Sequence, residues 1–297
     1  MFKYRVNNIT CFVALLVIFT TNRASSQNLI LNGSFEINNA SVGINHVNIS
    51  NTVFNNLVSF CHSFGNYGID LITTDTWDGF AQHGNWYIGI GILESSIDIF
   101  SMELSDSLIQ GDTYQLVFYD NARESYHYAS CFVEIGLSEQ KDDFGILIYS
   151  SPTTALYNEW TLKYHFFNAP NNGKFLTVRS KSPTSGECWV KVDNFCLSKG
   201  EWCIELPEFK MPNVFTPNND GINDVFKPVI FKGMKTGKLT ILNRWGGVLF
   251  ETDDLTQGWN GMVDNKFVTE GVYFWKAEYT TIFDETKTEH GVLSLFR

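Results

Sequence analysis

Short apolar runs separated by turn-forming residues constrain the fold of this chain more than any other feature. The runs are rich in Val, Ile, Phe, Tyr and Trp, and clusters of Gly, Asn, Asp, Ser and Pro divide them. Thr113–Tyr119 alternates over part of its length, which is the period of a strand with one buried face. No segment keeps a 3.6-residue apolar period over three helical turns. The pattern therefore predicts an all-β protein.

The spacing of the runs predicts two β-domains of different size. Eight runs between residues 28 and 198 predict a two-sheet sandwich, most simply a jelly roll: Asn28–Phe35, Trp86–Ile92, Ile97–Leu104, Thr113–Tyr119, Cys131–Leu137, Trp160–Phe167, Lys174–Arg179 and Cys188–Leu197. Five later runs predict a small Ig-like sandwich: Asp224–Phe231, Lys238–Asn243, Val248–Glu251, Gly271–Thr280 and Glu289–Phe296. We expect domains at residues 27–198 and 209–297, joined by a linker at 199–208.

The N-terminus has the pattern of a secretory signal peptide. Lys3 and Arg5 precede the apolar run Cys11–Phe19, and small residues follow at Ala24–Ser26. The run is too short to span a bilayer, so we expect cleavage after Ser26. Cys11 lies inside the run and not at the cleavage point, which argues against a lipoprotein anchor. No later stretch has the length of a membrane helix, so the mature chain is expected to carry no membrane span.

The charge of the chain is concentrated in the first predicted domain. The chain has 21 basic and 32 acidic residues, a net charge of −11. Because the first 23 residues carry +3 and residues 209–297 carry −1, residues 24–208 carry −13. Nucleic-acid binding depends on Lys and Arg neutralising phosphates, so this balance argues against a nucleic-acid partner.

Five cysteines follow the expected signal peptide: Cys61, Cys131, Cys188, Cys196 and Cys203. An exported chain meets an oxidising compartment in which disulfides form. The odd number leaves at least one thiol unpaired within the chain. No two of them have C-x-x-C spacing, which favours structural thiols or disulfides over a zinc site. Cys188 with Cys196, or either of these with Cys131, are plausible pairs, and the sequence leaves the choice open.

A series of motifs in order marks the C-terminal region. They are Met211-Pro-Asn-Val-Phe-Thr-Pro-Asn-Asn-Asp-Gly-Ile-Asn-Asp-Val-Phe226, Ile241-Leu-Asn-Arg-Trp-Gly-Gly-Val-Leu-Phe250, Gly258-Trp-Asn-Gly261, Glu270-Gly-Val-Tyr-Phe-Trp275 and Gly291-Val-Leu-Ser-Leu-Phe-Arg297. The series resembles the gliding-motility-associated, type B C-terminal sorting domain of Bacteroidetes proteins that leave the cell by type IX secretion. The resemblance implies that residues 209–297 are recognised by the outer-membrane secretion machinery. It also implies a product that is secreted or held at the cell surface.

The same region can be interpreted residue by residue. Asn218–Asp224 is dense in side chains that tolerate left-handed turns, which favours a plain turn over a calcium loop. Asn219 stands where the family pattern usually has Gly, a mild departure because Asn also accepts left-handed geometry. Arg244–Gly247 predicts a tight hairpin turn. We expect Trp245 and Trp259 to lie in the core of this domain.

The two ends of the first domain carry a second resemblance. Asn28-Leu-Ile-Leu-Asn-Gly-Ser-Phe-Glu36 opens it, Gly111-Asp-Thr-Tyr-Gln-Leu-Val-Phe-Tyr119 lies in its middle, and Trp189-Val-Lys-Val-Asp-Asn-Phe-Cys-Leu197 closes it. These motifs resemble galactose-binding-like jelly rolls, including carbohydrate-binding modules. In that fold the first and last strands are neighbours, and many members hold a structural Ca²⁺ near them. The resemblance implies Glu36 and Asp193 as side-chain ligands. The alternative is that both acids only bond to strand ends and turns.

A glycan site would need exposed aromatic rings beside polar groups. The loop Asp120–Tyr128 brings such residue types together between two strands, and loops on a rigid sandwich commonly carry binding residues. Trp86 and Trp160 begin apolar runs and are expected in the core. The predicted ligand-binding residues are Trp77, Arg123, Tyr126, His127 and Tyr128.

No arrangement of catalytic residues emerges from the sequence. It has no G-x-S-x-G elbow, no H-E-x-x-H motif and no E-x-D-x-x-E strand. We therefore predict no catalytic residues and a protein that is not an enzyme. The leading hypothesis is an exported binding or adhesion protein with a glycan as its ligand. The alternatives are a structural surface protein or protein–protein adhesin without a glycan site and, third, a glycoside hydrolase or lyase.

Overall fold

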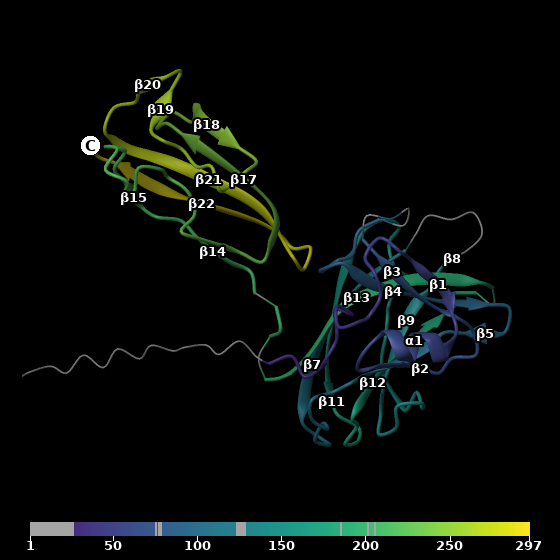
Figure 1. Cartoon of the computed structure of the whole chain (residues 1–297). Coiled ribbons are helices and arrows are strands. Elements are labelled where there is room, and N and C mark those ends of the chain that lie inside the picture. The colour runs from purple at the N-terminus through teal and green to yellow at the C-terminus, as the bar shows by residue number, and fades with distance from the viewer. Residues whose placement is uncertain are drawn as a thin grey trace, which may run out of the picture.

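The computed structural model describes residues 27–74, 76, 79–122, 129–184, 186–200, 202–204 and 206–297. Almost all regular structure in these residues is β, as the sequence predicts. Figure 1 shows two separate β-rich domains joined by an extended segment. Each domain has its own buried apolar cluster, one within residues 30–197 and one within residues 215–295. No described helix has the length and hydropathy needed to cross a membrane.

The first domain is a sandwich of two mainly antiparallel sheets, in agreement with the predicted jelly roll. The larger sheet has the order β1 (His46–Ile49), β3 (Ile69–Thr73), β4 (Trp86–Leu93), β13 (Cys188–Lys199), β7 (Thr113–Asn121) and β11 (Thr161–Asn168), with β5 (Ser96–Ile97) beside β4 and β8 (Ala129–Ser130) beside β13. The smaller sheet has the order β10 (Ile146–Ser150), β9 (Phe132–Ser138), β12 (Phe175–Lys181), β6 (Ile99–Glu103) and β2 (Cys61–Ser63).

Aromatic rings fill the space between the two sheets. The ring of Phe118 on β7 stacks on Phe195 of β13 with centroids 5.0 Å apart. Phe35 meets both Phe195 and Phe100 edge to face, at 6.1 and 5.9 Å. Rings in these arrangements gain about 0.5–1.5 kcal/mol per pair beyond their burial. The first and last motifs of the domain therefore meet in its core.

One strand predicted for this domain is absent, and one short helix was not predicted. Asn28–Phe35 is not a strand: it contains turns and a single bridge from Ile30 to Leu104. Asn28 instead accepts a backbone hydrogen bond from Leu197, and Phe35 has a φ of 60°. A short helix, α1 (Asn51–Leu57), was not expected, and Ser50 caps it by accepting a hydrogen bond from the Val53 N–H.

Two disulfides tie down the end of the first domain. Cys131 is bonded to Cys188, which is one of the pairings the sequence left open. Cys196 is bonded to Cys203, a pairing that was not predicted from the sequence. Cys61 is a buried free thiol, in agreement with the odd number of cysteines.

The second domain is a small sandwich built on one five-stranded sheet. Its order is β15 (Val214–Phe215), β22 (Thr286–Leu295), β21 (Gly271–Thr281), β17 (Met234–Leu242) and β18 (Val248–Thr252). Two short ribbons complete the domain: β14 (Glu208–Lys210) with β16 (Ile230–Lys232), and β19 (Met262–Val263) with β20 (Lys266–Phe267). Trp259 is fully buried among Phe215, Phe226 and Tyr273, as predicted.

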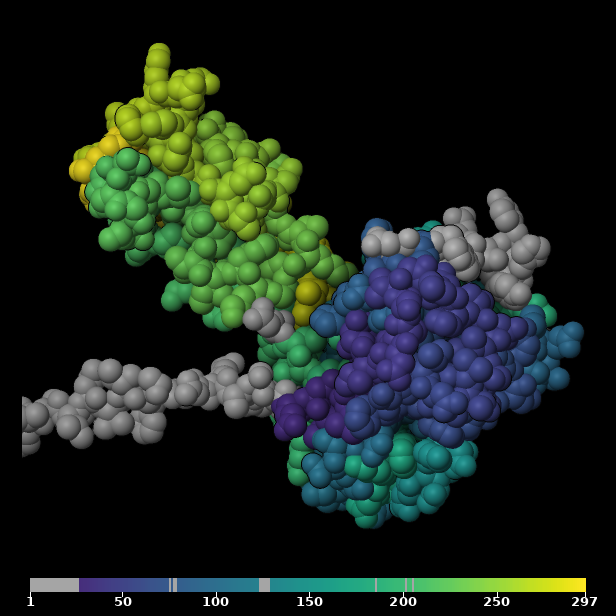
Figure 2. All heavy atoms as spheres, viewed as in Figure 1, coloured from purple at the N-terminus to yellow at the C-terminus, as the bar shows by residue number. Residues whose placement is uncertain are grey.

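Aromatic side chains meet at the junction of the two domains. Trp202 follows the first domain and lies 5.1 Å from Phe166 of β11, centroid to centroid. The same ring is 5.6 Å from Phe283, at the tip of the β21–β22 hairpin. Figure 2 shows the two domains as separate lobes that meet over a small area. The Cys196–Cys203 disulfide lies beside Trp202 and ties this part of the linker to β13.

Candidate functional sites

The side chain of Trp189 lies over two glycines on the outer face of the larger sheet. Along β4, Trp86, Ile88 and Ile90 belong to the core, so the residues that alternate with them face outward. Two of these outward-facing residues are Gly89 and Gly91. A Cβ added to Gly89 would lie 2.4 Å from Cζ2 of Trp189, and one added to Gly91 would lie 3.1 Å from its Cδ1. The indole of Trp189 therefore rests directly on the β4 backbone, where only glycine leaves room for it.

Polar and aromatic neighbours hold this indole in place. Its Nε1–H donates to Oδ2 of Asp70 on β3 at 3.0 Å. The Nζ atom of Lys191 lies 5.9 Å from the Trp189 ring and 5.6 Å from the ring of Tyr87. Trp160 covers Tyr87 edge to face at 5.7 Å, and its Nε1–H donates to the Phe80 carbonyl at 3.0 Å. Trp160 is half-buried on this outer face, whereas the sequence predicted it in the core.

This arrangement has the chemistry of a stacking platform. The Trp189 side chain is half-buried, and the half-buried carboxylate of Asp70 lies beside it, whereas Lys191 is buried. An aromatic ring next to such a carboxylate can pack on the apolar face of a sugar ring while the carboxylate bonds to its hydroxyls. In the sequence, Trp189 stood out only as part of the closing motif. The missed signal was the pair of glycines at alternate positions of the Trp86–Leu93 strand.

The predicted ligand-binding residues Trp77, Arg123, Tyr126, His127 and Tyr128 lie outside the described residues. Two described residues that lie close to them in sequence, Phe80 and Ala122, both form hydrogen bonds with the segment 156–160. The Phe80 carbonyl accepts the Trp160 Nε1–H, and the Ala122 N–H donates to the Leu156 carbonyl at 2.8 Å. The side chains of Phe80 and Tyr157 are exposed.

Glu36 and Asp193 hold one segment of the chain from opposite ends. Oδ2 of Asp193 accepts the backbone N–H groups of Gln82 and His83 at 2.9 and 3.0 Å. Oε1 of Glu36 accepts those of Asn85 and Trp86, both at 2.8 Å. The two acids therefore position the segment that connects Phe80 to β4. Sequence reasoning identified this pair only through the resemblance.

The electrostatics at Asp193 oppose its negative charge. Burial raises the pKa of the Asp193 carboxyl well above its ordinary range, and the nearby charge of Glu36 raises it further. The N–H groups of Gln82, His83 and Asn194 act in the opposite direction. Both oxygens of Asp193 accept backbone N–H groups, since Oδ1 also accepts that of Asn194 at 2.6 Å. Within the described part of the chain no group of three His, Cys, Asp or Glu side chains is placed to hold a metal, so backbone or amide oxygens would have to complete the shell.

In the second domain the Asn218–Asp224 segment forms the predicted turn. The two carboxylate oxygens of Asp224 accept the N–H groups of Asn219 and Gly221 at 2.6 and 2.8 Å. Asn219 has a φ of 65°, so it adopts the left-handed geometry expected of it. Trp245 contradicts its prediction: its side chain is 82% exposed, although it was expected in the core.

The architecture is that of a modular extracellular protein, with two independent β-domains and two disulfides in the described residues. Residues 209–295 match the CHU_C Type IX secretion signal domain. This domain directs the chain to export, so the protein is secreted or held at the cell surface. No curated protein matches the chain in sequence.

Several solved structures are weakly similar to the chain. An arabinose-bound MgGH51 α-L-arabinofuranosidase has 13% identity and a TM-score of 0.40, over 60% of this chain and 27% of that one. The C-terminal family 22 carbohydrate-binding module of Clostridium thermocellum Xyn10B has 12% identity and a TM-score of 0.34, over 59% and 98%. The K3 cleaved adhesin domain of Lys-gingipain from Porphyromonas gingivalis W83 has 13% identity and a TM-score of 0.32, over 52% and 100%. This chain thus spans only about a quarter of the arabinofuranosidase structure.

Proposed function

We propose that this exported protein binds a glycan through the outer face of the larger sheet in its first domain. The observation that carries the proposal is the half-buried indole of Trp189, which lies over Gly89 and Gly91 beside the carboxylate of Asp70. Further contacts to the glycan are predicted from Trp77, Arg123, Tyr126, His127 and Tyr128.

A glycan array followed by titration calorimetry on the purified full chain tests this proposal. We expect saturable binding to a selected glycan. Trp189→Ala should weaken it by about 2 kcal/mol, roughly thirtyfold in Kd, because a central aromatic contact is lost. Trp189→Phe should recover part of the affinity because it keeps a ring. Leu147→Ala is the matched control, since that exposed side chain lies on β10 of the opposite sheet.

The outcomes separate the proposal from its alternatives. A blank array from a chain with normal circular dichroism would contradict the glycan proposal and favour a structural surface protein or a protein–protein adhesin. Release of reducing sugars from a polysaccharide would favour the glycoside hydrolase alternative. Undiminished binding by Trp189→Ala would show that the glycan is held elsewhere.

The proposal includes a structural Ca²⁺ at Glu36 and Asp193, which would fix the segment between Phe80 and β4. The expected effect of pH on the stability of the fold follows from the raised pKa of Asp193. A native carboxyl that keeps its proton above the ordinary Asp range stabilises the fold at low pH, and this contribution is lost as pH rises through the native pKa. A bound cation favours the ionised form, so it should lower that pKa and offset the loss at neutral pH.

Thermal unfolding in calcium and in EDTA at pH 7 measures this effect. At a free concentration about 100-fold above Kd, calcium should add about 2.7 kcal/mol to the free energy of unfolding. Asp193→Asn should abolish the difference between the two buffers, because the variant lacks the charge. Equal unfolding curves for the unaltered chain in calcium and EDTA would mean that the acids act only as acceptors for the backbone N–H groups.

A further inference from the structure

The most exposed large apolar side chain among the described residues is on a rigid turn of the second domain. Trp245 is 82% exposed. Oδ1 of Asn243 accepts the N–H groups of Trp245 and Gly247 at 3.0 and 2.9 Å, and the Asn243 N–H donates to the Gly247 carbonyl. Gly246 has a φ of 81°, which glycine adopts without strain. The fold therefore holds the indole in water by a well-bonded turn, and not by local disorder of the backbone.

A row of apolar residues crosses the outer face of the sheet beside this turn. The register pairs Val248 with Leu242, Leu242 with Phe274, and Phe274 with Val292, across β18, β17, β21 and β22. Val248, Phe274 and Val292 are 58%, 41% and 49% exposed. The inward-facing neighbours of Phe274, Tyr273 and Trp275, belong to the core, so the row lies on the face away from it. Such a contiguous exposed row is typical of an interaction surface.

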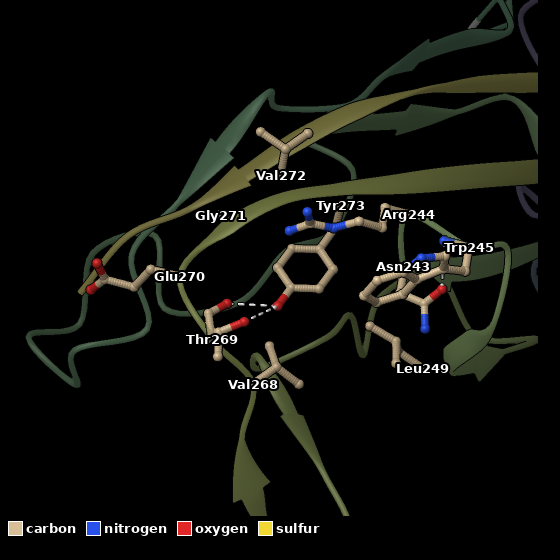
Figure 3. Close-up of a pocket in the computed structure, with 10 residues that line it drawn as sticks. All are labelled: Asn243, Arg244, Trp245, Leu249, Val268, Thr269, Glu270, Gly271, Val272 and Tyr273. Carbon is tan, nitrogen blue, oxygen red and sulfur yellow. Dashed lines mark hydrogen bonds between the residues drawn. The ribbon is translucent and has the colours of Figure 1, made fainter.

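A hollow of about 210 Å³ lies next to the turn. Figure 3 shows Trp245 and Leu249 along one part of it and Thr269 along another, with Tyr273 and the Arg244 guanidinium between them in this view. The Tyr273 hydroxyl donates to the Thr269 carbonyl at 2.6 Å and so fixes that side.

Two charged side chains line the hollow, Glu270 and Arg244, and they make different contacts. The carboxylate of Glu270 accepts the backbone N–H of Arg297 at 2.8 Å. The guanidinium of Arg244 lies 5.2 Å from the Trp245 ring. A cation beside an exposed indole suits a partner that presents an apolar recess and a carboxylate.

We propose that a protein of the type IX secretion machinery captures this domain by one surface. That surface consists of Trp245, Arg244 and the row formed by Val248, Leu242, Phe274 and Val292. This inference rests on the assignment of residues 209–295 as a secretion signal domain. The partner surface has an apolar recess that takes the Trp245 indole and an acidic side chain that pairs with Arg244. Trp and Arg are the residue types that most often dominate the energy of protein–protein interfaces, and Phe is also enriched there.

The test follows secretion of the full chain in a bacterium that has the type IX system. Trp245→Ala should lower the secreted fraction at least tenfold, with the protein accumulating in the periplasm. Trp245→Phe should restore part of the secretion, and Phe274→Ala should reduce it by a smaller factor. The thermal unfolding midpoint of purified Trp245→Ala should be unchanged, because an exposed ring contributes little to the core.

Ile222→Ala is the matched control for this test. Ile222 is 67% exposed in the same domain and follows β15, at the opposite edge of the sheet from β18. We expect normal secretion of this variant. Normal secretion of Trp245→Ala, combined with retention of a chain that lacks residues 209–297, would overturn the proposed surface while the sorting role stands. Secretion of the truncated chain would overturn the sorting role itself.

A second copy of the chain is the competing occupant of this surface. Sedimentation velocity over a range of concentrations distinguishes the two. We expect a monomer for both the unaltered chain and Trp245→Ala. A dimer of the unaltered chain that Trp245→Ala abolishes would assign the surface to self-association and contradict capture by the secretion machinery.

Discussion

Deletion of residues 209–297 is expected to stop release of the protein and to trap it in the periplasm. The deleted region contains the match to the secretion signal domain, and its core is separate from that of the first domain. The truncated chain should therefore keep its fold but lose the part that the outer-membrane machinery recognises. Immunoblots of medium, surface and periplasmic fractions should show a loss of more than tenfold outside the cell.

A reciprocal fusion strengthens this test. Residues 209–297 placed behind a signal peptide and a folded periplasmic reporter should carry the reporter out of the cell. The same reporter without these residues is the control and should stay in the periplasm. Release of the truncated chain at the normal level would contradict the sorting role.

The second large effect is expected from loss of the Cys131–Cys188 disulfide. The bond joins β13 to the segment before β9 across 57 residues of sequence. Closing a loop of that length restricts the unfolded chain, which corresponds to about 4 kcal/mol at 25 °C. The double variant Cys131→Ser/Cys188→Ser should lower the free energy of unfolding by an amount of this order, as measured by denaturant titration.

The other disulfide provides a matched comparison. Cys196–Cys203 closes only seven residues, for which the same relation gives about 2 kcal/mol. Cys196→Ser/Cys203→Ser should therefore have the smaller effect on the free energy of unfolding. A larger loss from this pair would mean that it acts on the folded state, for example by positioning Trp202 at the junction of the two domains.

Much of the fold follows from local sequence pattern, and the exceptions have identifiable causes. The strand predicted at Trp86–Ile92 is present as Trp86–Leu93, because its Ile residues alternate with residues on the other face. Asn28–Phe35 has the composition of a strand, yet the Ile30 N–H donates to the Asn28 side chain and the Leu29 N–H donates to the carbonyl of the distant Leu197. The helix Asn51–Leu57 buries only Phe54, so its seven residues carry no recognisable period.

The candidate sites were predictable only in part. Glu36 and Asp193 were identified from a resemblance, and the structure brings both to the same segment, residues 82–86. Trp189 was not predicted as a site residue, because its role depends on lying across Gly89 and Gly91, about 100 residues away in sequence. Trp245 was expected in the core because tryptophan usually is, and only the three-dimensional arrangement shows its exposure.

Neighbouring residues in the chain are enough to specify its all-β character, the hairpin turn at Arg244–Gly247 and the export signal. Which cysteines pair, which rings are buried and where Trp189 and Trp245 lie became clear only from the tertiary structure. The physical reason is that strand period and turn geometry depend on residues close in sequence. Burial, disulfide pairing and stacking depend on which distant strands become neighbours in a sheet.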